Sequence, residues 1–220
     1  MPAILFGSIS TVVDSSELQR RAFNESFEAH GLDWHWSQPD YVAMLESNGG
    51  VQRIADYAEA RGDDVDADAV HATKSQIFQE LLGSAGLKAR PGVVATVTEA
   101  KRRDIKVGFV TTTSPENISA LLEALSPDIH ADSFDLIVDR DSVASPKPDA
   151  EAYVFALEQL GENSGSVVAI EDNVGGVAAA SAAGVKCIAF PNENTADGDF
   201  ASAAETVDSL DAERLLGLVA

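Results

Sequence analysis

The sequence predicts an α/β fold: a doubly wound parallel sheet forms a core domain, and a helical cap domain is inserted after its first strand. Short apolar segments alternate with helical stretches at the start of the chain and over its second half. Such alternation is typical of parallel strands joined by right-handed crossovers. Residues 16–88 break this rhythm, because they have helical spacing and no convincing strand. The length of 220 residues suits one domain with a smaller insertion.

Five segments are predicted to be buried parallel strands, because each is short, apolar, partly β-branched and bounded by polar or turn residues. They are residues 3–6, 107–111, 134–138, 167–170 and 185–190. Helical patterns over 115–125, 149–160 and 174–183 lie between the last four.

The inserted region is predicted to hold four helices, at 17–30, 40–46, 50–61 and 66–82. Glycine and proline separate these stretches, and Pro91 is well placed to start the helix by which the chain returns to the sheet. We therefore expect a core domain of residues 1–14 and 90–220 and a cap of residues 15–89.

The composition limits the partners. A net charge of −21 disfavours nucleic acid and anionic membrane surfaces. No apolar run approaches the roughly 20 residues of a membrane span, and the first residues lack the charge of a signal peptide, so we expect a cytoplasmic protein. The single cysteine, Cys187, lies in an apolar run and is expected to be buried.

Polar residues follow the predicted strands at their carboxyl ends, where open α/β sheets bind ligands. They are the hydroxyls of residues 111–114, Lys147 between two prolines, and the carboxylates of Glu171 and Asp172. Together they predict a phosphate site with a metal site beside it. Taken singly, the hydroxyls or the carboxylates could cap helices and Lys147 could occupy a surface turn.

Three of these segments resemble motifs of the haloacid dehalogenase (HAD) type phosphatases. Residues 107–111, VGFVT, are similar to the second motif, whose Thr or Ser binds the phosphoryl group. Residues 147–153, KPDAEAY, are similar to the third, whose Lys neutralises phosphate and nucleophile. Residues 168–176, VAIEDNVGG, are similar to the fourth, whose acids hold Mg²⁺. The resemblance implies phosphate contacts from Thr111, Thr112 and Lys147.

The first motif departs from the family. Residues 7–15 read GSISTVVDS where the family has D-x-D-G-T-L-x-D-S. Gly7 thus stands at the nucleophile position and Ile9 at the acid/base position. Glycine has no nucleophile and isoleucine cannot transfer a proton, and losing such groups costs on the order of 10⁶ in rate.

The insertion resembles the cap of the phosphoglucomutase-like branch, with xylulose-1,5-bisphosphate phosphatases as the best match. The matching segments are 31–36, GLDWHW, 49–54, GGVQRI, and 71–74, HATK. The resemblance implies that Arg53 and Lys74 face a sugar phosphate, although a surface salt bridge is an open alternative for Arg53. We expect Trp34 and Trp36 in the cap core, and His35 and His71 at structural positions.

These residues predict a pocket that keeps a phosphorylated metabolite, such as a sugar phosphate, but has impaired phosphoryl transfer. Without an acid at position 7, Mg²⁺ binding through Asp172 and Glu171 should be weak. Ser8 is expected to point away from the face of residues 7 and 9, as in an extended chain. The alternatives are an active, diverged sugar-phosphate phosphatase that uses another group, and a purely structural role.

Overall fold

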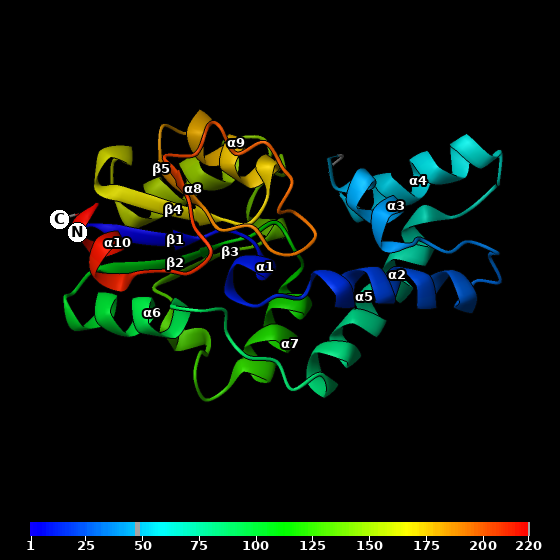
Figure 1. The fold of residues 1–220 in the computed structure, drawn as a ribbon, viewed down its shortest axis with the longest axis horizontal. Coiled ribbons are helices and arrows are strands. Elements are labelled where there is room, and N and C mark those ends of the chain that lie inside the picture. Colours follow the sequence, from blue (N-terminus) through cyan, green and yellow to red (C-terminus); the bar gives the residue numbers. More distant parts are fainter. Residues whose placement is uncertain (47–48, 220) are drawn as a thin grey trace.

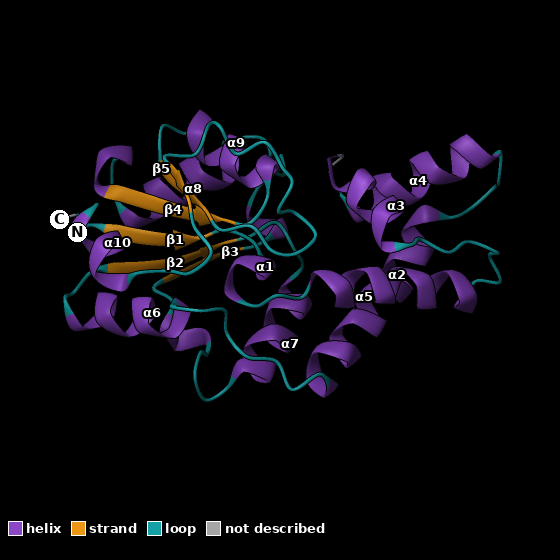
Figure 2. Cartoon of the chain, in the orientation of Figure 1, coloured by secondary structure: helices purple, strands orange, loops and turns teal. Residues whose placement is uncertain are grey.

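The computed structural model describes residues 1–46 and 49–219. A sheet flanked by helices forms one end of the molecule, and a purely helical region forms the other (Figure 1). The two chain termini lie together at the sheet end, far from those helices, so the carboxyl ends of the strands face the inserted region (Figures 1 and 2).

The sheet has the strand order β3-β2-β1-β4-β5-β6, and every neighbouring pair is parallel. The strands are β1 (Ala3–Phe6), β2 (Lys106–Val110), β3 (Leu136–Val138), β4 (Val167–Glu171), β5 (Lys186–Ala189) and β6 (Glu205–Thr206). The prediction of an α/β fold with a parallel sheet is thus confirmed. The two-residue β6 was not predicted, because it is too short to carry a hydrophobic pattern.

Residues alternate between the two faces of β1, and each face has its own apolar core. Ile4 and Phe6 belong to a cluster with α6 (Val93–Arg102), α7 (Pro115–Leu125) and α10 (Ala212–Gly217). Ala3 and Leu5 belong to a second cluster with α8 (Glu151–Leu160) and α9 (Val174–Ala182). Cys187 is buried in this second cluster, as predicted.

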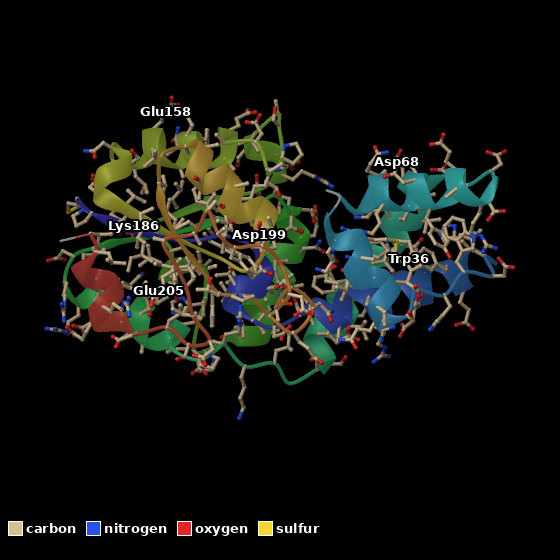
Figure 3. All side chains as sticks on the ribbon, turned by 45° about the horizontal axis from the view of Figure 1, so that its top comes forward. Trp36, Asp68, Glu158, Lys186, Asp199 and Glu205 are labelled. Atoms are coloured by element: carbon tan, nitrogen blue, oxygen red, sulfur yellow. The ribbon has the colours of Figure 1, made fainter. Side chains whose placement is uncertain are left out.

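The inserted region consists of helices and carries a third apolar cluster. Its helices are α2 (Ser16–Ala29), α3 (Gln38–Ala43) with the 3₁₀ turn η1 (Met44–Glu46), α4 (Gly50–Arg61) and α5 (Ala67–Ser84). Trp36 is fully buried, with its ring 4.6 Å from that of Phe27 and 4.9 Å from that of Phe23, while acidic side chains such as Asp68 project outward (Figure 3). The expectation that Trp34 and Trp36 are core residues is confirmed.

The inserted helices rest on the core through α5. Phe78 and Leu82 of α5 belong to the first core cluster, and Gln79 Nε2 donates to Asn117 Oδ1 of α7 at 3.0 Å. The exact domain boundaries stay a prediction. None of the helices in the described ranges combines the length and the apolar character needed to cross a membrane.

One prediction about the chain after β1 is wrong. Residues 9–12 form a one-turn helix, α1 (Ile9–Val12), with Ser8 at its N-cap position, so the chain is not extended here. The turn leaves Ile9 4% exposed and brings Ser8 to the same cavity that Ile9 lines, so the two residues do not point to opposite faces as expected.

Candidate functional site

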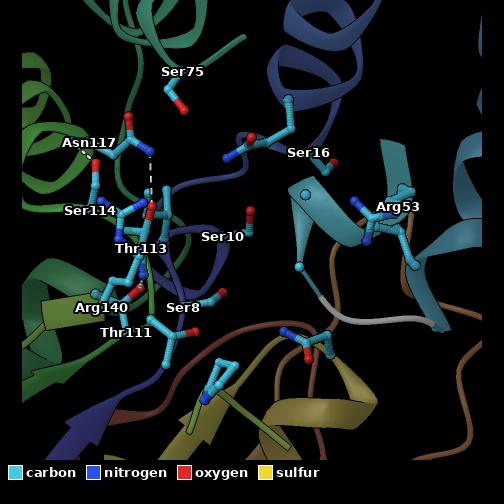
Figure 4. Close-up of a pocket in the computed structure, with 18 of the residues that line it drawn as sticks. Ser8, Ser10, Ser16, Arg53, Ser75, Thr111, Thr113, Ser114, Asn117 and Arg140 are labelled. Atoms are coloured by element: carbon cyan, nitrogen blue, oxygen red, sulfur yellow. Dashed lines mark hydrogen bonds between the residues drawn. The ribbon is translucent and has the colours of Figure 1, made fainter. Parts of the chain in front are cut away.

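A cavity of about 490 Å³ lies between the carboxyl ends of the strands and the inserted helices. Figure 4 shows the lining side chains, with Arg53 on the cap side and Ser8 and Thr111 on the core side. Many of them carry hydroxyl or amide groups: Ser8, Ser10, Ser16, Gln19, Ser75, Thr111, Thr112, Thr113, Ser114, Asn117, Asn173, Asn192 and Thr195. This volume is typical of a site for a small molecule.

The charges that line the cavity favour an anion. Arg53 and Lys74 come from the cap and Arg140 from the segment after β3, whereas Asp172 is the one carboxylate among the described lining residues. The positively charged side chains thus outnumber the negatively charged ones in this cavity, although the chain as a whole has a net charge of −21. Such a field concentrates negatively charged ligands.

The loop after β2 presents hydroxyls beside the start of α7. Thr111 is buried and its Oγ1 accepts a hydrogen bond from the Thr113 amide at 3.2 Å. Asn117 Nδ2 donates to Thr113 Oγ1 at 3.0 Å, which fixes the loop (Figure 4). Ser114 is the N-cap of α7, so the alternative that these hydroxyls cap a helix holds for Ser114. Thr111 and Thr112 line the cavity and do not cap this helix.

The space above Gly7 is filled by the side chain of Glu171. A Cβ atom placed on Gly7 would lie closer than 3.0 Å to the Glu171 carboxyl group, and so would one placed on Gly176. Glu171 is fully buried between these two glycines and does not line the cavity. The carboxylate therefore occupies the volume in which a side chain at position 7 would begin.

Lys147 is paired with this buried carboxylate. Its Nζ donates to Glu171 Oε1 at 2.5 Å and to the Val110 carbonyl at 2.7 Å, and Tyr153 Oη donates to the same Oε1 at 2.6 Å. Glu171 Oε2 has no hydrogen-bond partner among the residues that the structure describes. Burial raises the pKa of Glu171, and the Lys147 ammonium opposes this rise. The positive charge of Lys147 is thus satisfied beneath the cavity, and its phosphate contact stays a prediction.

Asp172 faces the cavity, but neutral donors occupy its carboxylate. Oδ1 accepts from Ser8 Oγ and from Asn173 Nδ2, and Oδ2 accepts from Asn192 Nδ2 at 2.8 Å. Asn173 caps α9, so neither Glu171 nor Asp172 is the helix cap that the sequence allowed.

These residues do not fit a Mg²⁺ site in the arrangement described. Mg²⁺ requires several oxygen ligands in near-octahedral geometry. Glu171 is turned toward an ammonium and a phenol, both oxygens of Asp172 already accept hydrogen bonds from neutral donors, and position 7 offers no side chain. No group of three or more candidate metal ligands occurs within residues 1–46 and 49–219.

The cap side of the cavity is formed by Arg53, Lys74 and His71. Arg53 is buried and not at the solvent-facing position of the alternative: its Nε donates to the Met44 carbonyl at 3.0 Å and its guanidinium carbon lies 5.6 Å from the Tyr41 ring centroid. Burial lowers the pKa of the Arg53 guanidinium.

Sequence reasoning missed or misassigned several cavity residues, including Ser8, His71 and Arg140. Ser8 was assigned to the wrong face, His71 was expected to be structural, and Arg140 was not considered. Arg140 follows a strand end, as the other candidates do, and that position was the available signal. His35, which the sequence placed at a structural position, is exposed and does not line the cavity.

Comparison with known proteins places the chain in a family. A family model for haloacid dehalogenase-like hydrolases matches residues 1–184. The protein CbbY of Cereibacter sphaeroides is 38% identical over 211 residues, which cover 94% of this chain and 91% of the relative. CbbY of Rhodobacter capsulatus is 34% identical over 215 residues, covering 96% and 95%.

Comparison with solved structures supports the same family assignment. The crystal structure of CbbY from Rhodobacter sphaeroides in complex with phosphate has a TM-score of 0.89 at 37% identity and covers 95% of each chain. A structure of a mutant of that protein in complex with xylulose-(1,5)bisphosphate gives the same values. With its sheet, its inserted helices and these matches, the chain belongs to the haloacid dehalogenase-like hydrolase family, in the branch that contains CbbY.

Proposed function

We propose that this protein binds a phosphorylated sugar in the cavity between cap and core without performing the phosphoryl transfer of its family. One observation carries the proposal. Glu171, and not a nucleophilic side chain of residue 7, fills the space above Gly7, where it is paired with Lys147. A carboxylate buried in this way does not line the cavity, so it is not placed to attack phosphorus.

The acid/base position supports the same conclusion. Ile9 is 4% exposed and packs in the core cluster, and its alkyl side chain can neither protonate a leaving group nor activate water. Both steps of the family's covalent mechanism therefore lack their group.

Retained ligand binding is supported by the lining of the cavity. The hydroxyls of Thr111 and Thr112 and the cations Arg53, Lys74 and Arg140 are suited to a phosphate dianion. Among the relatives, CbbY has been crystallised with phosphate and with xylulose-(1,5)bisphosphate, and a similar Thermotoga maritima protein is named a phosphorylated carbohydrates phosphatase.

Binding without metal is part of the proposal. A family site with acids at positions 7, 9, 171 and 172 needs Mg²⁺ before a dianion can enter. Here Lys147 neutralises Glu171, and the cavity retains Asp172 against Arg53 and Arg140, with Lys74 as a further cation when it is protonated. Any Mg²⁺ that does bind through Asp172 should be weakly held.

The test is a panel of sugar phosphates and bisphosphates assayed for phosphate release and for thermal stabilisation. We expect stabilisation without release. Thr111→Val should weaken binding, and Arg21→Gln, which removes an exposed cation that does not line the cavity, should not. Steady release of phosphate by the highly purified protein would refute the proposal, and so would the absence of any stabilising ligand.

A second candidate, an active phosphatase, is favoured by the pairing of Ser8 and Asp172. Ser8 Oγ lines the cavity and donates to Asp172 Oδ1. A carboxylate that accepts a hydroxyl proton is the arrangement of an activated nucleophile. This candidate requires phosphate release that Ser8→Ala abolishes, and a phosphorylated peptide containing Ser8.

A further inference from the structure

We infer that Asn194 is a latch that holds the inserted helices closed over the cavity, and that Asp172 anchors the loop that carries this latch. The loop is residues 191–195, which follow β5. The inference goes beyond the proposed function, because it concerns how the cap is held in place and does not depend on which ligand the cavity binds.

Asn194 joins the core to two helices of the inserted region. Its side chain is buried, with 3% exposed. Asn194 Nδ2 donates to Glu17 Oε1 of α2 at 2.9 Å, and Gln38 Nε2 of α3 donates to Asn194 Oδ1 at 2.9 Å. A carboxylate only accepts hydrogen bonds, so Glu17 fixes the orientation of this amide and directs its oxygen toward Gln38. Both polar groups of one side chain are therefore engaged with the cap.

The same loop is fastened to the wall of the cavity. The Asn194 backbone amide donates to Asn192 Oδ1 at 2.9 Å, and Asn192 Nδ2 donates to Asp172 Oδ2 at 2.8 Å. Thr195 Oγ1 donates to the Asp172 carbonyl at 2.6 Å. Asp172, Asn192 and Thr195 all line the cavity. A continuous series of hydrogen bonds thus connects a carboxylate of the cavity with two helices of the cap.

This contact differs in chemistry from the contact that α5 makes with the core. The α5 contact buries Phe78 and Leu82, and exposing such apolar surface to water is unfavourable. The Asn194 contact consists of hydrogen bonds, which water replaces when the groups separate. The Glu17 side chain is 42% exposed and Gln38 is half-buried, so water already reaches both groups. The α5 contact is therefore suited to persist as a hinge while the Asn194 contact breaks.

A reversal of polarity at this contact tests the inference. Asn194→Asp removes the donor and places a carboxylate opposite that of Glu17. Adding Glu17→Gln to the same chain supplies an amide that donates to the new carboxylate. We expect Asn194→Asp to lower the ratio of closed to open molecules by at least about tenfold, the effect of a lost hydrogen bond and a like-charge contact. The double variant should restore the wild-type ratio.

Distances between two spin labels measure this ratio. Asp68 of α5 and Glu158 of α8 are exposed (Figure 3), and Cys187 is buried, so labels attach to Asp68→Cys and Glu158→Cys. Double electron–electron resonance at pH 8 should give one main distance in the otherwise unchanged protein and added longer distances with Asn194→Asp. A distribution that Asn194→Asp leaves unchanged, or a change that Glu17→Gln fails to reverse, overturns the inference.

Two further variants separate the latch from a general loss of stability. Gln38→Ala removes one of the two hydrogen bonds at a half-buried position, so it should add longer distances even if Asn194→Asp prevents folding. Asn163→Ala removes an asparagine hydrogen bond to the Gly165 amide within the core and should leave the distances unchanged. No effect of Gln38→Ala, or an equal effect of Asn163→Ala, would also overturn the inference.

Discussion

The substitution Gly7→Ala tests the position of Glu171 with a single methyl group. The new Cβ would lie closer than 3.0 Å to the Glu171 carboxyl group, a separation that real Cβ atoms essentially never show. Glu171 would therefore leave its place. Its hydrogen bonds with Lys147, at 2.5 Å, and with Tyr153, at 2.6 Å, would break.

The expected cost follows from the burial of these groups. Glu171 is fully buried and the Lys147 side chain is 9% exposed. Separating a buried ion pair costs about 3–5 kcal/mol. For a chain of this length each kcal/mol corresponds to roughly 2–4 °C, so the melting temperature should fall by roughly 6–20 °C.

Chemical denaturation and thermal melting measure this effect. Gly176→Ala should destabilise similarly, because it contacts the same carboxylate from the other side. Gly83→Ala is the matched control: Gly83 lies within α5 with nothing within 4 Å of its Cβ position, and alanine there should stabilise by up to about 1 kcal/mol. A Gly7→Ala protein as stable as the wild type would refute the placement of Glu171.

Three further predictions concern the cap and the cavity. The folded pKa of Lys74, about 7, lies below the ordinary value of 10.5, so the unfolded chain binds the extra proton between these values and stability rises with pH. We expect urea titrations at pH 7 and 8.5 to show that Lys74→Met removes up to about 2 kcal/mol of the rise seen in the wild-type protein. An unchanged rise in the variant would contradict this prediction. Thr111→Val should weaken phosphate binding roughly tenfold by calorimetry, the effect of about 1.4 kcal/mol for a lost hydrogen bond, and an unchanged Kd would exclude Thr111 as a ligand. Trp36→Ala should cost about 3–5 kcal/mol in urea denaturation, since the ring is fully buried, and a loss below about 1 kcal/mol would contradict its core role.

The elements of the fold could be predicted because hydrophobic pattern determines them locally. Residues 3–6, 50–61 and 115–125 have the bounds that their spacing predicts. The convergence of residues 111–112 and Asp172 at one cavity could be predicted as well, because parallel strands end at the same edge of the sheet.

The side-chain arrangement at Gly7 could not be predicted from motifs. The fourth motif indicates that Glu171 is a metal ligand, and the third indicates that Lys147 binds phosphate. Their pairing depends on the room that two glycines, far apart in sequence, leave around one carboxylate. The orientation of Ser8 depends on a one-turn helix, which is too short to give a periodic signal. The roles of these residues stay predictions until they are measured.

The most direct measurement is a calorimetric titration of the wild-type protein with inorganic phosphate, performed once in EDTA and once in excess Mg²⁺. An anion cavity in which Lys147 already neutralises Glu171 should bind phosphate in EDTA, with a Kd within about twofold of the value in Mg²⁺. Phosphate binding that appears only when Mg²⁺ is present would contradict this, and would mean that the carboxylates still form the metal site of the family.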